Sequence, residues 1–171
     1  MTSLYQLTVP LFVKHLKALD GILVKAQAHV KELGLDEAVL LAEQLAPDMF
    51  PLKKQIQVAC DNAKGLAARL SGTENPVHAD DEETFAQLRA RIEKTLTFLA
   101  GISEESFAGA EERKIEISYF PGKYMTGFDY AREYALPNFF FHVVTAYDIL
   151  RKERLVIGKT DYVGSLPLRD L

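Results

Sequence analysis

Leu136–Arg151 reads LPNFFFHVVTAYDILR and contains the densest aromatic run of the chain, together with His142, one of its four histidines. At 3.6 residues per turn, the apolar residues of this stretch form one arc of a helix. They are Phe139, Val143, Ala146, Tyr147 and Leu150. Asn138, His142 and Thr145 lie along the border of that arc. The stretch therefore predicts a helix that is either an ordinary core helix or the wall of a site.

Three other long segments show the same helical spacing of apolar residues. The first begins between Ser3 and Thr8 and ends near Leu33, the second runs from Leu52 to about Ser71, and the third covers about 81–100. Pro10 has no N–H and suits only a first turn, which favours a start near Thr8, or a kink if the helix starts earlier. Asp80 with Glu83 resembles a capping box for the third helix. A shorter amphipathic segment covers 36–45.

Residues 113–119 alternate polar and apolar side chains, which predicts a strand. A turn at 120–123 leads to a second strand at 124–127, and a helix that starts within 128–135 is reset at Pro137. Residues 155–171 show no periodicity, so we expect them to wrap the surface as coil. The predicted fold is all-α, a four-helix bundle with a small β-hairpin or extended insertion between helices three and four. We expect a single domain over residues 1–171.

The composition excludes several classes of partner. The 171 residues are 48% hydrophobic and 26% charged, with a net charge of −4 and no basic patch, so we expect no nucleic-acid partner. No apolar run approaches the length of a membrane span, which predicts no membrane partner. The N-terminal residues lack the pattern of a signal peptide, and the lone cysteine, Cys60, rules out an intrachain disulfide. We expect a cytoplasmic protein with Cys60 buried as a small apolar side chain.

The histidines do not form a recognisable metal motif. His142 is followed four residues later by Ala146, and His15 and His29 are 14 residues apart on one helix, or about 21 Å. One ion cannot bind both. His142 and Asp61 are the two remaining candidates, fewer than the three protein ligands of a typical catalytic zinc. We therefore predict no metal-binding residues and no cofactor, with a divalent metal as the alternative.

His142 is the candidate catalytic residue, because an imidazole titrates near neutrality and can act as acid or base. Asp61, Asn138 and Tyr147 are candidates to bind a small-molecule ligand together with His142. Tyrosines gather in the second half of the chain, where they either line a pocket or cover the core. The alternative for His142 is a hydrogen-bonded histidine at the edge of the core. His78 lies in a loop beside acidic residues, and we expect it to be solvated.

Three motifs resemble an uncharacterised bacterial family of domains of unknown function, similar to the DinB/YfiT-like superfamily of four-helix bundles. They are LAPDMFPL at 45–52, PNFFFH at 137–142 before TAY at 145–147, and IGKTDYVG at 157–164. The resemblance covers nearly the whole chain and implies a DinB-like fold. Members of that superfamily typically bind a divalent metal through one histidine of helix two and a His-x-x-x-His pair of helix four. Here helix two has no histidine, and His142 is the only histidine of helix four.

Two functional hypotheses follow. The first is a small-molecule enzyme that has lost the three-histidine metal site and uses His142 as its acid or base. The second is a non-enzymatic bundle that binds a ligand or self-associates, for which the resemblance implies a homodimer and Phe141 supplies an apolar side chain outside the predicted arc.

Overall fold

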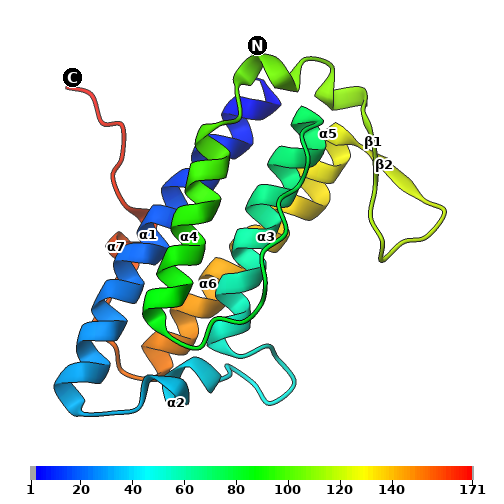
Figure 1. The fold of residues 1–171 in the computed structure, drawn as a ribbon. Coiled ribbons are helices and arrows are strands. Elements are labelled where there is room, and N and C mark those ends of the chain that lie inside the picture. Colours follow the sequence, from blue (N-terminus) through cyan, green and yellow to red (C-terminus); the bar gives the residue numbers. More distant parts are fainter. Residues whose placement is uncertain (1–2, 171) are drawn as a thin grey trace.

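Four long helices lie side by side in the structure, which is a computed structural model that describes residues 3–170 (Figure 1). They are α1 (Leu4–Leu33), α3 (Leu52–Ser71), α4 (Phe85–Ala100) and α6 (Leu136–Lys152). Shorter helices are α2 (Glu37–Ala42), α5 (Gly127–Asp129) and α7 (Lys159–Val163). The mostly helical fold is confirmed, but the predicted count of four fits only the long helices.

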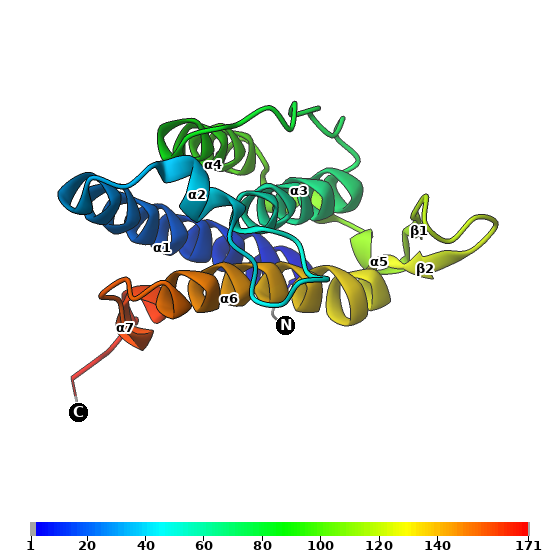
Figure 2. The same ribbon diagram turned by 90° about the horizontal axis from the view of Figure 1, so that it is seen from below.

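The connection between α3 and α4 explains why α3 is so deeply buried. Both helices run in the same direction, so residues 72–84 return along the side of α3 (Figure 1). Figure 2 shows α3 between α4 and α6, and it packs against both. Thirteen of its twenty residues are buried, among them Gln55, Gln57 and Lys64. A single apolar stripe does not predict this, because the returning segment covers a side of α3 that its sequence marks as polar.

Apolar side chains from all four long helices form one core cluster. The ring of Phe12 on α1 lies 4.4 Å from that of Phe139 on α6, measured between centroids. Both are fully buried, and each such side chain contributes roughly 1.5–3 kcal/mol by leaving water. Cys60 is also fully buried, as predicted, and this burial raises the pKa of the thiol to about 12.

The start of α1 falls within the predicted range but not near Thr8, and the predicted start of α4 is wrong. α1 begins at Leu4 with a capping box between Ser3 and Gln6, so Pro10 lies inside the helix. The capping box provides partners for the first N–H groups. The stabilisation that this gives outweighs the cost of the backbone hydrogen bond that Pro10 cannot donate. α4 begins at Phe85, and its capping box joins Thr84 and Gln87 rather than Asp80 and Glu83.

The predicted hairpin is confirmed. It consists of β1 (Lys114–Glu116) and β2 (Tyr124–Thr126), which pair antiparallel with Ile115 opposite Met125. Two short 3₁₀ helices, η1 (Glu104–Phe107) and η2 (Ala110–Glu112), precede it. Gly127 follows β2, and a Cβ there would lie 1.9 Å from the Ala110 carbonyl oxygen, so only glycine permits this approach.

The reset predicted at Pro137 takes the form of a π-helical turn. This turn, η3 (Tyr130–Ala135), joins α5 to α6 without a break in the helical path. Pro137 lies in the first turn of α6, where it lacks an N–H and its ring crowds the carbonyl four residues earlier. A wider turn directly before it relieves that crowding.

The coil predicted for residues 155–171 is wrong for the part that forms α7. This helix packs against α1, where Lys25 Nζ lies 2.6 Å from Asp161 Oδ1. Asp161 also accepts a 2.8 Å hydrogen bond from the Gly158 N–H. The partner that stabilises this short helix lies 136 residues away in the sequence, which local periodicity cannot reveal. In the described part of the chain, no helix has both the length and the apolarity needed to cross a membrane.

Candidate functional site

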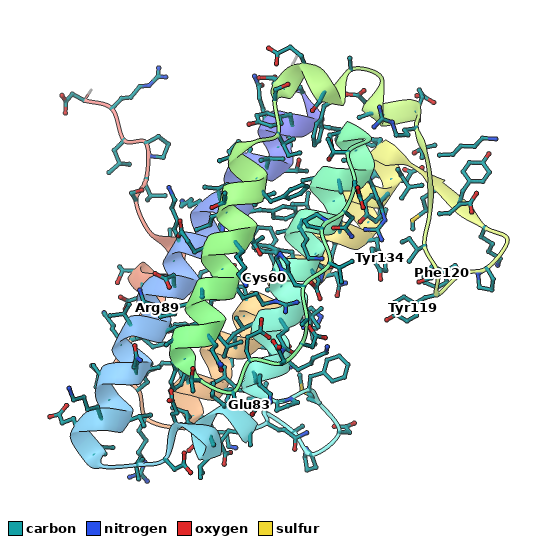
Figure 3. The ribbon with its side chains drawn as sticks, in the orientation of Figure 1. Cys60, Glu83, Arg89, Tyr119, Phe120 and Tyr134 are labelled. Atoms are coloured by element: carbon teal, nitrogen blue, oxygen red, sulfur yellow. The ribbon has the colours of Figure 1, made fainter. Side chains whose placement is uncertain are left out.

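A groove of about 740 Å³ lies between α3, α6, the returning segment 72–84 and the hairpin. We call it the polar groove, because it combines charged, amide, imidazole and phenol side chains. Phe120 of the hairpin packs edge-on against Tyr134 at 6.3 Å between ring centroids, and Figure 3 shows Tyr119 and Phe120 on the hairpin beside Tyr134. A second hollow of about 600 Å³ between α1 and α4 has only Lys17 and Glu93 as charged lining residues. The groups suited to chemistry therefore concentrate in the polar groove.

His142 faces α3, where a hydrogen-bonded glutamine fixes its tautomer. Gln55 Nε2 donates to the Phe50 carbonyl oxygen at 2.8 Å, which turns Gln55 Oε1 toward His142 Nδ1 at 2.6 Å. Because Oε1 can only accept, Nδ1 carries the proton and Nε2 keeps its lone pair. Burial lowers the pKa of His142 to about 4, so the ring is neutral at pH 7. His142 thus offers a hydrogen-bond acceptor to the groove that it lines.

Asn138 lies one turn before His142 and pairs with an amide of α3. Asn62 Nδ2 donates to the Val58 carbonyl oxygen at 3.0 Å, and Asn62 Oδ1 accepts from Asn138 Nδ2 at 2.9 Å. This chain of bonds orients both amides and leaves Oδ1 of Asn138 as a second acceptor on α6. We call Gln55, Asn62, Asn138 and His142 the amide–imidazole cluster.

The donor set of these two helices does not fit the three-histidine site that the resemblance implies. Within residues 3–170, no group of three or more histidine, cysteine, aspartate or glutamate side chains is placed to hold a metal ion. His142 is the one imidazole of the amide–imidazole cluster, and its Nδ1 is already bonded to Gln55. The carboxamides that face it are neutral and bonded to one another or to backbone carbonyls. We therefore derive no metal-dependent step from this site.

On the other side of α3, Arg91 of α4 is buried among carboxylates. Only 1% of its side chain is exposed. Its terminal nitrogens lie 2.8 Å from Asp61, 3.0 Å from Asp80 and 3.0 Å from Glu82. Gln57 donates to the second oxygen of Glu82 at 2.8 Å. These residues form what we call the ionic cluster, which holds the returning segment against α3 and α4.

Two lysines of α3 join the ionic cluster to the polar groove. Lys54 Nζ lies 2.5 Å from Asp80, and Lys64 Nζ lies 3.2 Å from Asp61. The Lys54 ammonium is the main cause of a lowered pKa for Asp80, and Arg91 adds to it. Each groove carboxylate is thus shared between Arg91 and one lysine.

The structure brings together three of the four residues predicted to bind a ligand. Asp61, Asn138 and His142 line the polar groove. Tyr147 lies elsewhere, half-buried and 6.4 Å from the ring of Tyr162, measured between centroids. Whether these residues bind a ligand remains a prediction. The expectation of a solvated His78 is wrong for Nδ1, which is buried and has no hydrogen-bond partner among the described residues.

Several residues of the site escaped the sequence-based prediction. Arg91 had an available signal, because it follows Leu88 by three residues and precedes Thr95 by four, which places it on a buried face of α4. Gln55 and Asn62 had none, since a glutamine or asparagine on a long helix is most often solvated. Their partners are distant in the sequence: Asn138 is 76 positions from Asn62, and His142 is 87 positions from Gln55.

The arrangement of the helices and the hairpin recurs in a solved structure. The crystal structure of a DinB family member protein from Shewanella denitrificans superimposes with a TM-score of 0.94 and 46% sequence identity, over 98% of this chain and 96% of that one. The chain therefore has a DinB-like helical fold. The model of the family described as Domain of unknown function (DUF1993) matches residues 4–163, and the chain belongs to that family. Both findings confirm the resemblance seen in the three sequence motifs. No curated protein matches the chain.

Proposed function

We propose that the polar groove binds a small polar molecule, to which His142 Nε2 and Asn138 Oδ1 act as hydrogen-bond acceptors. The observation that carries this proposal is the bond from His142 Nδ1 to Gln55 Oε1, because it fixes the tautomer and leaves Nε2 able to accept. His142 Nε2 makes no hydrogen bond within residues 3–170 and is not one of the buried unpaired atoms, so it is accessible to a donor group of a ligand. A volume of about 740 Å³ also falls in the range typical of small-molecule sites.

The basicity of His142 favours binding over acid–base catalysis. A general base works best when its pKa lies near the operating pH, and burial lowers the pKa of His142 to about 4. A ring with this pKa holds almost no proton at pH 7, so it accepts a hydrogen bond more readily than it carries a proton. Of the two hypotheses, the non-enzymatic ligand-binding bundle is therefore the better supported.

The proposal is tested by NMR on protein with ¹⁵N-labelled histidine. The probes are a panel of small polyols, amides, amines, carboxylates and phosphates. Binding in the groove shifts the Nε2 resonance of His142, because that nitrogen gains a hydrogen bond. A panel in which no compound shifts the His142 ring would contradict the proposal.

His142→Leu removes the acceptor at similar volume and should abolish the binding that the panel reveals. His15→Leu is the matched control, since His15 is also a buried histidine, on α1, and packs against Phe140 and Tyr162 outside the groove. Equal losses of binding in the two variants would count against a specific role for His142.

Self-association is a second candidate, favoured by apolar side chains left on the outer face of α6. Phe141 is 54% exposed and Val144 is 38% exposed. A C₂ dimer would bury this face against its own copy. Light scattering at micromolar concentration should then report a dimer, and Phe141→Ser should shift it to a monomer. A monomeric unmodified protein would rule out this candidate.

A further inference from the structure

Arg69 is held over the surface of α3 without a carboxylate partner. Its Nη1 donates to the Tyr130 hydroxyl at 3.2 Å, and its guanidinium carbon lies 5.7 Å from the centre of the Tyr130 ring. Among residues 3–170, no carboxylate forms an ion pair with it. Arg69 lines the polar groove, and the N–H groups of its guanidinium that are not bonded to Tyr130 are available to a ligand.

Gly65 is what lets Arg69 lie in this position. A Cβ at residue 65 would lie 2.6 Å from Nη1 of Arg69, closer than van der Waals contact permits. Glycine in a helix interior is unfavourable compared with alanine, and no other close contact of a Cβ at Gly65 accounts for it here. The sequence thus has glycine, an unfavourable residue in a helix interior, at the point where the guanidinium folds back over the helix.

Lys64 adds a second cation that is only partly neutralised. Its side chain is 7% exposed, and its one carboxylate partner in the described structure, Asp61, lies closer to Arg91. Together the groove and the ionic cluster behind it contain four cationic side chains and three carboxylates. The cations are Lys54, Lys64, Arg69 and Arg91, and the carboxylates are Asp61, Asp80 and Glu82. The groove therefore has a net positive charge although the chain as a whole is acidic.

The positive charges around the groove also affect the pKa of His78. It lines the groove from the returning segment, and the pKa of its ring is lowered first by burial and then by the charges of Lys64 and Arg91. Asp61 acts in the opposite direction but does not offset them. An anion in the groove would relieve this field and thereby change the environment of the His78 ring.

We infer that the ligand of the polar groove carries an anionic group, a carboxylate or a phosphate, which Lys64 and Arg69 contact. This inference rests on the proposed function and specifies the class of its ligand. Charge-assisted hydrogen bonds from an ammonium and a guanidinium suit both kinds of oxyanion. His142 and Asn138 of α6, which offer acceptors, would then bind the neutral polar part of the same molecule.

The test titrates inorganic phosphate, succinate and the neutral polyol erythritol into the full chain, with chloride added to keep the ionic strength constant. Dissociation constants come from calorimetry, and ¹⁵N-histidine spectra report His78 and His142. At least one anion should bind and shift the His78 ring. The tighter of phosphate and succinate identifies which oxyanion the groove prefers.

Two variants place that binding in the groove. Lys64→Met removes the charge from a side chain of similar shape, and Gly65→Ala displaces the guanidinium of Arg69 while keeping its charge. Each should weaken anion binding about tenfold, the loss expected for one charge-assisted hydrogen bond. The matched controls are Lys53→Met, on α3 outside the groove, and Gly21→Ala on α1, where an added Cβ meets nothing within 4 Å. Neither control should change the affinity.

The outcomes separate this inference from the proposed function. If a neutral compound binds at His142 while phosphate and succinate do not, the inference is overturned and the proposed function stands. If an anion binds equally well to Lys64→Met and Gly65→Ala, the anion does not use these groups and the inference again fails. If no probe binds at all, the proposed function is contradicted and the inference falls with it.

Discussion

The two polar clusters on either side of α3 differ in charge and in how fully their groups are bonded. Toward α4, the ionic cluster surrounds the buried Arg91 with three carboxylates. Toward α6, the amide–imidazole cluster is neutral and retains free acceptors on His142 and Asn138. A buried charge must be paired, so the ionic cluster is committed to holding the fold. Neutral groups tolerate incomplete pairing better, and this leaves the α6 side able to bind a ligand.

Among the substitutions that test this comparison, Arg91→Met should cause the largest loss of stability. It leaves Asp61, Asp80 and Glu82 close together without the cation between them, and removing one partner of a buried ion pair typically costs about 3–5 kcal/mol. We expect a loss of this size in the free energy of unfolding, measured in urea at pH 7.

Arg89→Met is the control for that change. Arg89 is two residues away on α4 and pairs with Asp20 at 2.8 Å, but 36% of its side chain is exposed. An exposed pair contributes about 0.2–1 kcal/mol, so this variant should lose far less stability. If the two arginine variants lose equal stability, the ionic cluster has no special structural role.

The two clusters should also respond to acid in different pH ranges. The folded-state pKa of His142 is about 4, below the usual 6.5, so the unfolded chain binds more protons between these values and stability falls as the pH drops from 6.5 to 4. The pKa of Asp80 is lowered from 3.8 by Lys54 and Arg91, so its contribution is present above pH 3.8 and is lost only as the pH falls further.

Urea unfolding at a series of pH values measures these losses, and NMR titration of the His142 ring locates its midpoint. His142→Leu should reduce the slope between pH 6.5 and 4 without removing it. His15 and His78 contribute to the remainder, because burial lowers the pKa of both. An unchanged slope in His142→Leu would show that this ring is not desolvated in solution.

The same contrast explains how far the sequence could predict the structure. Apolar spacing located the four long helices, and alternation located the hairpin, because these signals are local. The bonds from His142 to Gln55 and from Arg91 to Asp61 are not local, and each joins residues at least 30 positions apart. Residues Asp61, Asn138 and His142 could be chosen from chemistry and helix faces, whereas the cations beside them could not. From the sequence alone, Lys64 and Arg69 are expected to be solvated. Their environment in the groove depends on residues 72–84, which lie along α3.

Asn138→Ala tests the amide–imidazole cluster, and its expected effect is smaller. It removes the 2.9 Å bond to Asn62 but leaves Asn62 bonded to the Val58 carbonyl oxygen. A typical neutral hydrogen bond contributes about 0.5–1.5 kcal/mol, so we expect a loss of that size in urea unfolding. A loss as large as that of Arg91→Met would mean that the neutral cluster is structural too, which would contradict the comparison.

Tyr147→Phe should have the smallest effect, and it tests whether binding on α6 is confined to the face that carries Asn138 and His142. Tyr147 is half-buried beside Tyr162 and does not line the polar groove. Removing its hydroxyl should change the free energy of unfolding by less than about 0.5 kcal/mol, as for most substitutions away from a buried polar contact. Calorimetry with whichever probe binds the unmodified protein should give the same dissociation constant. If Tyr147→Phe instead weakens binding as much as His142→Leu, the ligand contacts a second face of α6, and the polar groove alone does not define the site.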